Sequence, residues 1–355
     1  MQKRSYRFGF LMILAVVTVA ALSGCGSAAQ PQSTQYKTTF LDLFDTVSQV
    51  IGYDADKESY TAFSQQVKND LAEYHALYDI YHDAAVTSIK TINDNAGIRP
   101  VTVDRRILDL LLESRDIYEL TGGKTNVAMG AVLTIWHNYR EAGIDNPESA
   151  QLPPMEDLLA AAQHVNIDDM VIDEEASTVY LRDPLMSLDV GAVAKGYATE
   201  RVAQQIEQTG RTSVLLSIGG NVRAIGVKPD GSVWNVAIQN PDLESEQTSL
   251  FTLGINNLSV VTSGSYQRYY VVDGVKYNHI IDPDTLMPTT YFSGISVVTA
   301  DSGLADGLST ALFCMPLEQG MALIQSIGGV EACWVAPDGE ITMTDGFRAL
   351  IEPEN

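Results

Sequence analysis

The stretch Ser187-Leu-Asp-Val-Gly-Ala-Val-Ala-Lys-Gly-Tyr-Ala-Thr-Glu200 is the most informative part of this 355-residue chain. Apolar residues at its beginning predict the end of a strand, the glycines predict a turn, and from Ala194 the apolar spacing becomes helical. Such a junction brings backbone N–H groups and the positive end of a helix dipole to one point. With Lys195 as a nearby cation, the junction suits a phosphate. The Gly-x-x-x-x-Gly-Lys-Ser/Thr spacing of the Walker phosphate-binding loop is absent, however. An ordinary strand-to-helix turn is therefore the alternative interpretation.

The segments around this stretch contain more hairpin patterns than strand–helix–strand units. Thr38–Tyr53 alternates like a strand or a hairpin, and further short strands recur around turn residues such as Asp273-Gly274. Helical spacing is predicted between these strands, at residues 57–81, 105–121, 155–163, 194–209 and 305–314. Interspersed hairpins and helices favour an α+β fold, with mixed, largely antiparallel sheets and flanking helices.

The N-terminus has the pattern of an export signal. A basic start is followed by the apolar run Phe8–Leu22, which is short for a transmembrane helix. Leu22-Ser-Gly-Cys25 then resembles the lipobox of bacterial lipoproteins. We therefore expect a lipoprotein signal peptide at 1–24, a lipid on Cys25, a polar tether at 25–37 and one domain at 38–355. The domain would be exported and anchored to the outer face of the cytoplasmic membrane. A plain secretory signal is the alternative.

The net charge of the chain excludes some classes of partner, and the positions of its cysteines predict their oxidation state. The chain carries 45 acidic and 22 basic residues, a formal net charge of −23. Such an acidic surface argues against nucleic acid and against adhesion to anionic lipid headgroups. Cys314 and Cys333 lie in apolar runs, which favours buried thiols and leaves a disulfide as the alternative.

Two groups of side chains have the spacing of a reactive site. Asp306 and Thr310 are four residues apart in a helical segment, with Ser309 beside them. A carboxylate beside hydroxyl oxygens suits a hard cation such as Mg²⁺, although these residues could also simply decorate a helical turn. His279 follows a strand, close to Asp282, where it could deprotonate a hydroxyl nucleophile or be purely structural.

Five ordered segments of the chain contain recognisable short motifs. They are Asp189-Val-Gly-Ala-Val-Ala-Lys-Gly-Tyr197, Ser217-Ile-Gly-Gly-Asn221, Thr262-Ser-Gly-Ser-Tyr-Gln-Arg268, Asn278-His-Ile-Ile-Asp-Pro283 and Ala305-Asp-Gly-Leu-Ser-Thr310. No motif is specific by itself, but in this order they resemble successive motifs of the ApbE family of FAD:protein FMN transferases. The resemblance extends from about Phe40 to Cys314.

The resemblance implies a reaction and a set of site residues. FMN would pass from FAD to a Thr or Ser hydroxyl of an exported or membrane-bound redox flavoprotein, and AMP would leave. His279 would act near the accepting hydroxyl, and Lys195 would steady the phosphates. Mg²⁺ would be held by the carbonyl of Ala192 and the side chains of Asp306, Ser309 and Thr310. FAD would contact Phe44, Thr125, Asn126, Asp189, Lys195 and Ile280.

Three positions depart from the family pattern. The family usually has Met-Gly-Thr where Phe44-Asp45-Thr46 stands, and Asp where Asn126 stands. These two departures could retune flavin affinity. Leu286 replaces a glycine that usually follows Asp-Pro-x-Thr, in a turn beside the site. Two other functions remain open from the sequence: hydrolysis of FAD by water at the same metal site, and a lipoprotein that binds FAD without chemistry.

Overall fold

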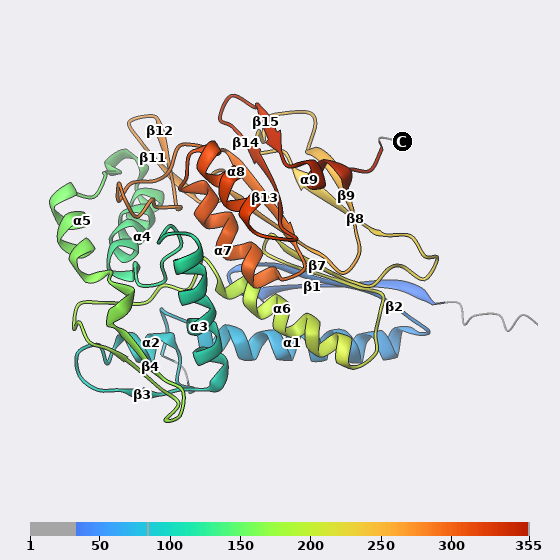
Figure 1. The fold of residues 1–355 in the computed structure, drawn as a ribbon, viewed down its shortest axis with the longest axis horizontal. Helices are drawn as coiled ribbons and strands as arrows, with labels where there is room; N and C mark the ends of the chain where they lie inside the picture. The colour runs from blue at the N-terminus through green and yellow to red at the C-terminus, as the bar shows by residue number, and fades with distance from the viewer. Residues whose placement is uncertain (1–32, 84, 354–355) are drawn as a thin grey trace, which may run out of the picture. The chain divides into compact units, whose positions relative to one another are not determined.

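The computed structural model describes residues 33–83 and 85–353 (Figure 1). The expected signal peptide, Cys25 and most of the expected tether lie outside these residues. The first strand, β1, begins at Thr34 and not after residue 37, because residues 34–37 already pair with the following strand. No helix in the described part of the chain is both long and apolar enough to cross a bilayer.

An eight-stranded sheet organises the domain, and all its neighbouring strands run antiparallel. Two-stranded and three-stranded sheets pack around it, and the mixture of helices with antiparallel sheets confirms the α+β class. In spatial order the large sheet comprises β1 (Thr34–Leu43), β2 (Thr46–Asp54), β6 (Val214–Ile218), β7 (Asn221–Ile225), β10 (Ser259–Gly264), β13 (Gly294–Thr299), β14 (Glu331–Val335) and β15 (Ile341–Met343).

The large sheet is covered on both faces at β13, and this explains why all six residues of β13 are buried. Ile295 and Val297 pack into the core under helix α7 (Ser302–Phe313), with α8 (Leu317–Ser326) beside it. Val298 points to the opposite face and packs with the hairpin β8 (Trp234–Gln239) and β9 (Ser249–Ile255), next to α9 (Asp345–Ala349). A strand buried on both faces has no need of polar alternation.

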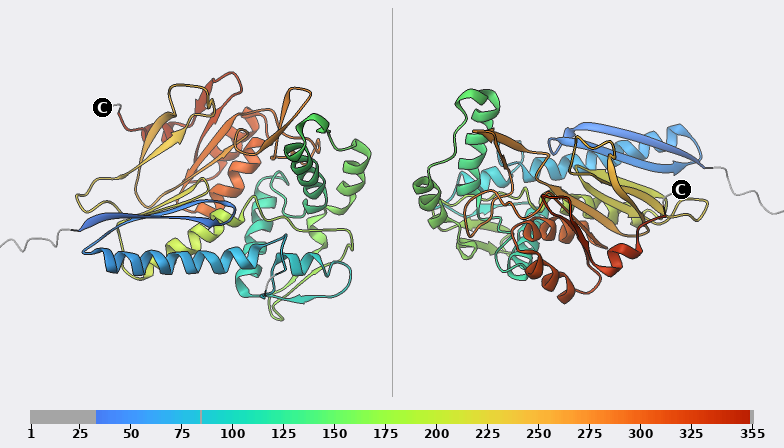
Figure 2. Two further views of the ribbon diagram at one scale, coloured as in Figure 1. Left: turned by 180° about the vertical axis from the view of Figure 1, so that it is seen from behind. Right: turned by 90° about the horizontal axis from the view of Figure 1, so that it is seen from above.

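Helix α1 (Lys57–Tyr78) lies along β1 and β2, with α6 (Ala194–Gln208) beside it, as Figures 1 and 2 show. Its apolar stripe is core, as the periodicity predicts. The helix ends at Tyr78 and not at residue 81, because the backbone of Asp79 is extended. The carboxylate of Asp79 then accepts hydrogen bonds from the amides of Tyr81 and His82.

The remaining elements form two smaller groups. Helix α2 (Ile89–Asn93) lies near the sheet β3 (Val101–Thr102), β5 (Thr178–Leu181) and β4 (Met170–Asp173), and Arg115 of α3 (Arg105–Leu120) donates to the carbonyl of Met170 at the start of β4. A second group has its own apolar core, and we call it the α4 module. It comprises α4 (Gly130–Asp145), α5 (Met155–Ala161) and the hairpin β11 (Tyr269–Val272) and β12 (Val275–Asn278).

The stretch that opened the sequence analysis forms the expected turn and helix, but not the expected strand. Ser187 makes only an isolated bridge to Met129, and the amide of Asp189 donates to the carbonyl of Val127. The segment is therefore tied to the loop before α4 instead of joining a sheet. Helix α6 begins at Ala194, as predicted.

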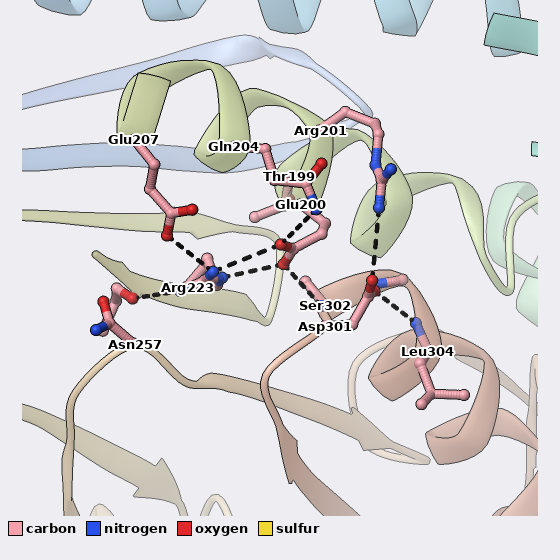
Figure 3. A network of polar contacts seen from close by, with 12 residues as sticks. Thr199, Glu200, Arg201, Gln204, Glu207, Arg223, Asn257, Asp301, Ser302 and Leu304 are labelled. Carbon is pink, nitrogen blue, oxygen red and sulfur yellow. Dashed lines mark hydrogen bonds and ion pairs between the residues drawn. The ribbon is translucent and has the colours of Figure 1, made fainter. Parts of the chain in front are cut away.

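Helices α6 and α7 cross at Gly196, where their backbones come very close. A Cβ at residue 196 would overlap the carbonyl oxygen of Ser302 and the Cβ of Asp306. The crossing is also held by a buried ion pair, which Figure 3 shows. Glu200 on α6 accepts from Arg223 on β7 at 3.0 Å and from the amide of Ser302, the first residue of α7, at 3.1 Å.

The two cysteines in the described residues are buried free thiols, as the sequence favours. Burial raises the pKa of Cys314 and of Cys333 to about 12, so neither is a reactive thiolate at neutral pH.

The crossing generates a stability prediction. Replacing Gly196 with alanine should lower the free energy of unfolding by about 1–3 kcal/mol, because the added methyl group forces α6 and α7 apart. Urea denaturation followed by circular dichroism measures this change. Gly328→Ala is the matched control, because a Cβ there meets open space. Equal midpoints for the two variants would contradict the close crossing.

Candidate active site

A cavity of about 340 Å³ lies where α6, α7, the α4 module and the tip of the β1–β2 hairpin meet. Of the eleven site residues that the sequence predicts among the described residues, nine line this cavity. They come from segments between residue 125 and residue 310, which the fold brings to one place. The nine are Thr125, Asn126, Asp189, Ala192, Lys195, His279, Ile280, Asp306 and Thr310.

The α6–α7 crossing places a carboxylate at the start of α6. The amide of Gly196 donates to Oδ2 of Asp306 at 2.8 Å, and Nζ of Lys195 lies 3.6 Å from the same oxygen. Asp306 is only 4 % exposed, and burial raises its pKa, while Lys195 and the Gly196 amide act in the opposite direction. A desolvated carboxylate of this kind is favoured as an anion when a cation binds it.

The oxygen atoms around Asp306 fit a hard cation. Thr310 lies one helical turn further along α7 and lines the cavity together with Ala192. Ser309, by contrast, is fully buried. Its hydroxyl donates to the carbonyl of Asp306 at 2.9 Å, and its oxygen lies 2.7 Å from the hydroxyl oxygen of Ser263. Nowhere among the described residues do three or more His, Cys, Asp or Glu side chains gather as a metal cluster. A site with one carboxylate suits Mg²⁺, which keeps phosphate oxygens and water as its other ligands.

His279 has a defined tautomer. Its Nδ1 lies 3.2 Å from the carbonyl oxygen of Arg268, and its backbone amide donates to the same oxygen at 3.1 Å. Because a carbonyl oxygen only accepts, Nδ1 carries the hydrogen and Nε2 has the free lone pair. Burial and the positive charges of Arg268, Arg140 and Lys195 lower the pKa of His279 to about 4. The imidazole is therefore neutral at pH 7 and able to accept a proton.

The residues expected to contact the flavin are held by the fold itself. The hydroxyl of Thr125 donates to the carbonyl of Gly307 at 2.7 Å, and Asp189 accepts from the amide of Gly191 at 2.8 Å. Burial raises the pKa of Asp189. The amide group of Asn126 donates to the carbonyl of Val165 at 3.0 Å, which a carboxylate could not do. The asparagine at this position thus has a structural partner of its own.

Phe44 does not line the cavity, contrary to the expectation that it contacts the flavin. With φ angles of 54° and 50°, Phe44 and Asp45 form the tight turn between β1 and β2. The ring of Phe44 packs edge-on against His75, with centroids 5.3 Å apart, and its amide donates to Nδ1 of His75. The next residues, Asp45 and Thr46, line the cavity instead.

Several cavity residues escaped the sequence analysis. Met129, Leu133, Trp136 and Arg140 follow one another at helical spacing and form the cavity face of α4 and its N-cap. That spacing was visible in the sequence and predicts one helix face. Tyr81 was predicted to be the last residue of α1, but it lies beyond the helix and its ring packs 5.2 Å from that of His137 at the cavity.

Leu286 occupies a left-handed backbone conformation, with φ of 59°. The turn therefore still has the geometry that favours glycine, and leucine costs about 1–2 kcal/mol there. The side chain is only 5 % exposed and packs in the α4 module, where burying a leucine gains about 1.5–3 kcal/mol. Nε1 of Trp136 donates to the backbone carbonyl of Leu286 at 2.9 Å, which also links this turn to α4.

The ammonium group of Lys124 also holds the loop that contains Leu286. Nζ of Lys124 lies 2.9 Å from Asp282 and 2.8 Å from Asp284, and Lys124 and Asp282 are largely buried. Because Lys124 precedes the Thr125 segment, this pair ties that segment to the loop that follows His279. The pair thus links two segments that line the cavity.

Comparison with protein families gives one match that spans most of the chain. The model of the ApbE family matches residues 34–334. A FAD:protein FMN transferase of Treponema pallidum is 32% identical over 274 residues, which is 74% of each chain. A FAD:protein FMN transferase of Klebsiella pneumoniae is 28% identical over 341 residues, covering 94% of this chain and 93% of its own.

Solved structures show the same fold. The ApbE protein of Thermotoga maritima superposes with a TM-score of 0.79 at 24% identity, covering 90% of this chain and all of its own. The flavin transferase ApbE of Vibrio cholerae superposes with a TM-score of 0.75 at 23% identity, covering 90% and 99%.

The surroundings of His279 generate a titration prediction. The chain has five histidines, and the ring C–H signals of His279 can be identified by their loss in His279→Asn. These signals should titrate near pH 4 in the NMR spectrum. Arg268→Gln should move the titration to higher pH, because it removes a positive charge beside the imidazole. Arg182→Gln, outside the cavity, serves as the control, and a His279 titration near pH 6.5 would contradict the assignment.

Proposed function

This chain belongs to the ApbE family, and on that premise we propose that it is a FAD:protein FMN transferase. The enzyme transfers FMN from FAD to a hydroxyl group of an acceptor protein and releases AMP. One observation supports this most directly. A neutral His279, the cation Lys195 and the oxygen set of Asp306 and Thr310 line the same cavity, although they are far apart in the chain.

The diphosphate of FAD is the anionic part of the substrate, and it fits the start of α6. There the positive end of the helix dipole lies beside Lys195, and Gly191 and Ala192 of the preceding turn line the cavity. Lys195 is held near this position because its Nζ lies 3.4 Å from the carbonyl of Gly191 and 3.6 Å from Asp306. It therefore remains beside the phosphates as negative charge moves to the leaving AMP.

Asp306, Thr310 and the carbonyl of Ala192 would hold Mg²⁺. Ser309 would support them by fixing the α7 turn through its bonds to Ser263 and to the Asp306 carbonyl. When bound, Mg²⁺ would neutralise the charge of the diphosphate and so make its phosphorus easier to attack.

His279 would act on the nucleophile. Its free Nε2 accepts the proton of a Thr or Ser hydroxyl, and the hydroxyl oxygen bonds to the phosphorus on the FMN side. The bond from that phosphorus to the oxygen of the AMP phosphate breaks, and AMP leaves with the bonding electrons. Positioning and charge neutralisation carry most of the rate in such transfers. The same Nε2 could take a proton from water, in which case FAD would be hydrolysed to FMN and AMP.

The N-terminal residues suggest where the enzyme works. We propose that residues 1–24 direct export and that Cys25 carries the lipid that anchors the domain to the outer face of the cytoplasmic membrane. The acceptor would then be an exported or membrane-bound redox flavoprotein. The basis is the sequence pattern Leu22-Ser-Gly-Cys25.

The transfer reaction is testable with the purified domain. Incubated with FAD, Mg²⁺ and a membrane fraction from the same organism, the domain should add the mass of one FMN to a Thr or Ser of an acceptor protein, with an equal amount of AMP released. Mass spectrometry of the acceptor and chromatography of the nucleotides measure both products. Free FMN plus AMP without a modified protein would indicate hydrolysis, and unchanged FAD would indicate binding alone.

The metal assignment gives a second prediction. Asp306→Asn keeps the shape of the side chain but removes its charge, so it should lower the transfer rate at least about 100-fold. It should also raise the Mg²⁺ concentration that gives half-maximal activity. Asp116→Asn, an exposed carboxylate of α3 outside the cavity, is the matched control. Full activity of Asp306→Asn at low Mg²⁺ would exclude Asp306 as a ligand.

A further inference from the structure

We propose that Arg268 is a further catalytic residue, whose guanidinium group binds the phosphate that the acceptor hydroxyl attacks. This inference rests on the proposed function, because it concerns the bond-forming step of that reaction. It assigns the two phosphates of FAD to different cations, Arg268 for the FMN side and Lys195 for the AMP side. Arg268 lines the cavity and immediately precedes β11, which lies beside α4 (Figure 1).

The backbone of Arg268 holds the base of the reaction in place. Its carbonyl oxygen accepts from the amide of His279 at 3.1 Å and lies 3.2 Å from Nδ1 of the same residue. The other edge of this segment is paired within the chain. There the amide of Thr289 donates to the carbonyl of Ile280, and the Asn278 side chain bonds to both residues. The imidazole therefore lies on the side of Arg268, and both side chains line the cavity.

The charge of Arg268 has no partner in the described part of the chain. The other Lys and Arg side chains that line the cavity each lie within 3.6 Å of a carboxylate, namely Lys124, Arg140 and Lys195. Arg268 is exposed, and no ion pair or hydrogen bond joins its guanidinium to another described residue. After burial, its charge is the largest cause of the lowered pKa of His279, so the guanidinium is close to the imidazole. A free cation beside the base indicates an anionic ligand from outside the chain.

The transfer step selects which anion this is. Nε2 of His279 takes the proton of the hydroxyl while the hydroxyl oxygen bonds to the FMN-side phosphorus, so that phosphorus starts about 3–3.5 Å from an oxygen beside the imidazole. The non-bridging oxygens of the transferred phosphorus carry charge in the transition state. A guanidinium can bind two such oxygens as a planar fork, and it stays protonated throughout. Arg268 would stabilise the phosphate under attack, whereas Lys195 would stay with the phosphate that leaves.

Substitution of Arg268 tests this role. Arg268→Gln should lower kcat for AMP release at least tenfold and change the KM for FAD less than threefold, because the contact is made mainly in the transition state. Arg268→Lys keeps the charge but not the fork, so its kcat should lie between those of Arg268→Gln and the original enzyme. Arg182→Gln, outside the cavity, is the matched control and should equal the original enzyme. The assay contains FAD, Mg²⁺ and the acceptor protein that gains FMN in the transfer experiment.

Rates measured at pH 8 exclude an indirect effect through His279. Loss of the positive charge of Arg268 raises the pKa of the imidazole from about 4, and at pH 8 the ring is still neutral in both enzymes. A more basic imidazole accepts the proton more readily, so an effect through His279 alone would raise kcat. A lower kcat at pH 8 therefore reports the loss of the guanidinium itself.

Sulfur substitution in FAD identifies the phosphate that Arg268 contacts. Sulfur in place of a non-bridging oxygen weakens the hydrogen bond from a guanidinium. On the FMN-side phosphorus, one of the two sulfur diastereomers should slow the original enzyme at least fivefold more than it slows Arg268→Gln, which has already lost the contact. On the AMP-side phosphorus, sulfur should slow both enzymes by the same factor. Each factor is a ratio of two rates of one variant, so partial unfolding of that variant does not change it.

The outcomes separate this inference from the proposed function. If FAD stays unchanged, the proposed function fails and the role of Arg268 fails with it. If AMP is released, a loss of less than tenfold in Arg268→Gln at pH 8, or equal effects of FMN-side sulfur on the two enzymes, overturns only the role of Arg268. AMP release without a modified protein contradicts the transfer, but the same two comparisons then decide the role of Arg268 with water as the nucleophile.

Discussion

The contact between α6 and α7 at Gly196 is the constraint on which the site depends. Because no side chain separates the two helices there, the amide of Gly196 reaches the carboxylate of Asp306 at 2.8 Å. The buried pair of Glu200 and Arg223 holds the same crossing and also binds the first amide of α7. Breaking a buried pair by removing one partner is strongly destabilising, so the pair maintains the alignment of α7 with α6.

The ionisable side chains that line the cavity differ in charge, and each charge suits a different role. Asp306 and Asp189 are desolvated carboxylates beside cations, which suits them to hold a positively charged or hydrogen-bonding ligand. His279 is kept neutral by burial and by the neighbouring positive charges. A chain with a formal net charge of −23 thus has a cavity with enough cations to receive an anionic dinucleotide.

Much of the site could be predicted from the sequence because the motifs are local. The turn before α6 and the spacing of Asp306 and Thr310 are each contained in a few residues, and their chemistry follows from residue type. The position of Phe44 outside the cavity lining could not be predicted, because motif position does not reveal that a tight turn directs its ring toward His75. Tyr81 was missed for a related reason: apolar spacing continues past the end of α1, where the Asp79 backbone leaves the helix.

By itself, the sequence determined the α+β class, most element positions, the family resemblance and the chemical types in the site, since these depend on local patterns of polarity and on motifs. Only the tertiary structure decided which residues share the cavity, that Asn126 donates to Val165, and that Leu286 is accommodated at a glycine-like φ by burial against the α4 module. The physical reason is that packing and hydrogen bonding act between segments far apart in the chain, such as Thr125 and Gly307, which are 182 residues apart, and no local pattern encodes such a contact.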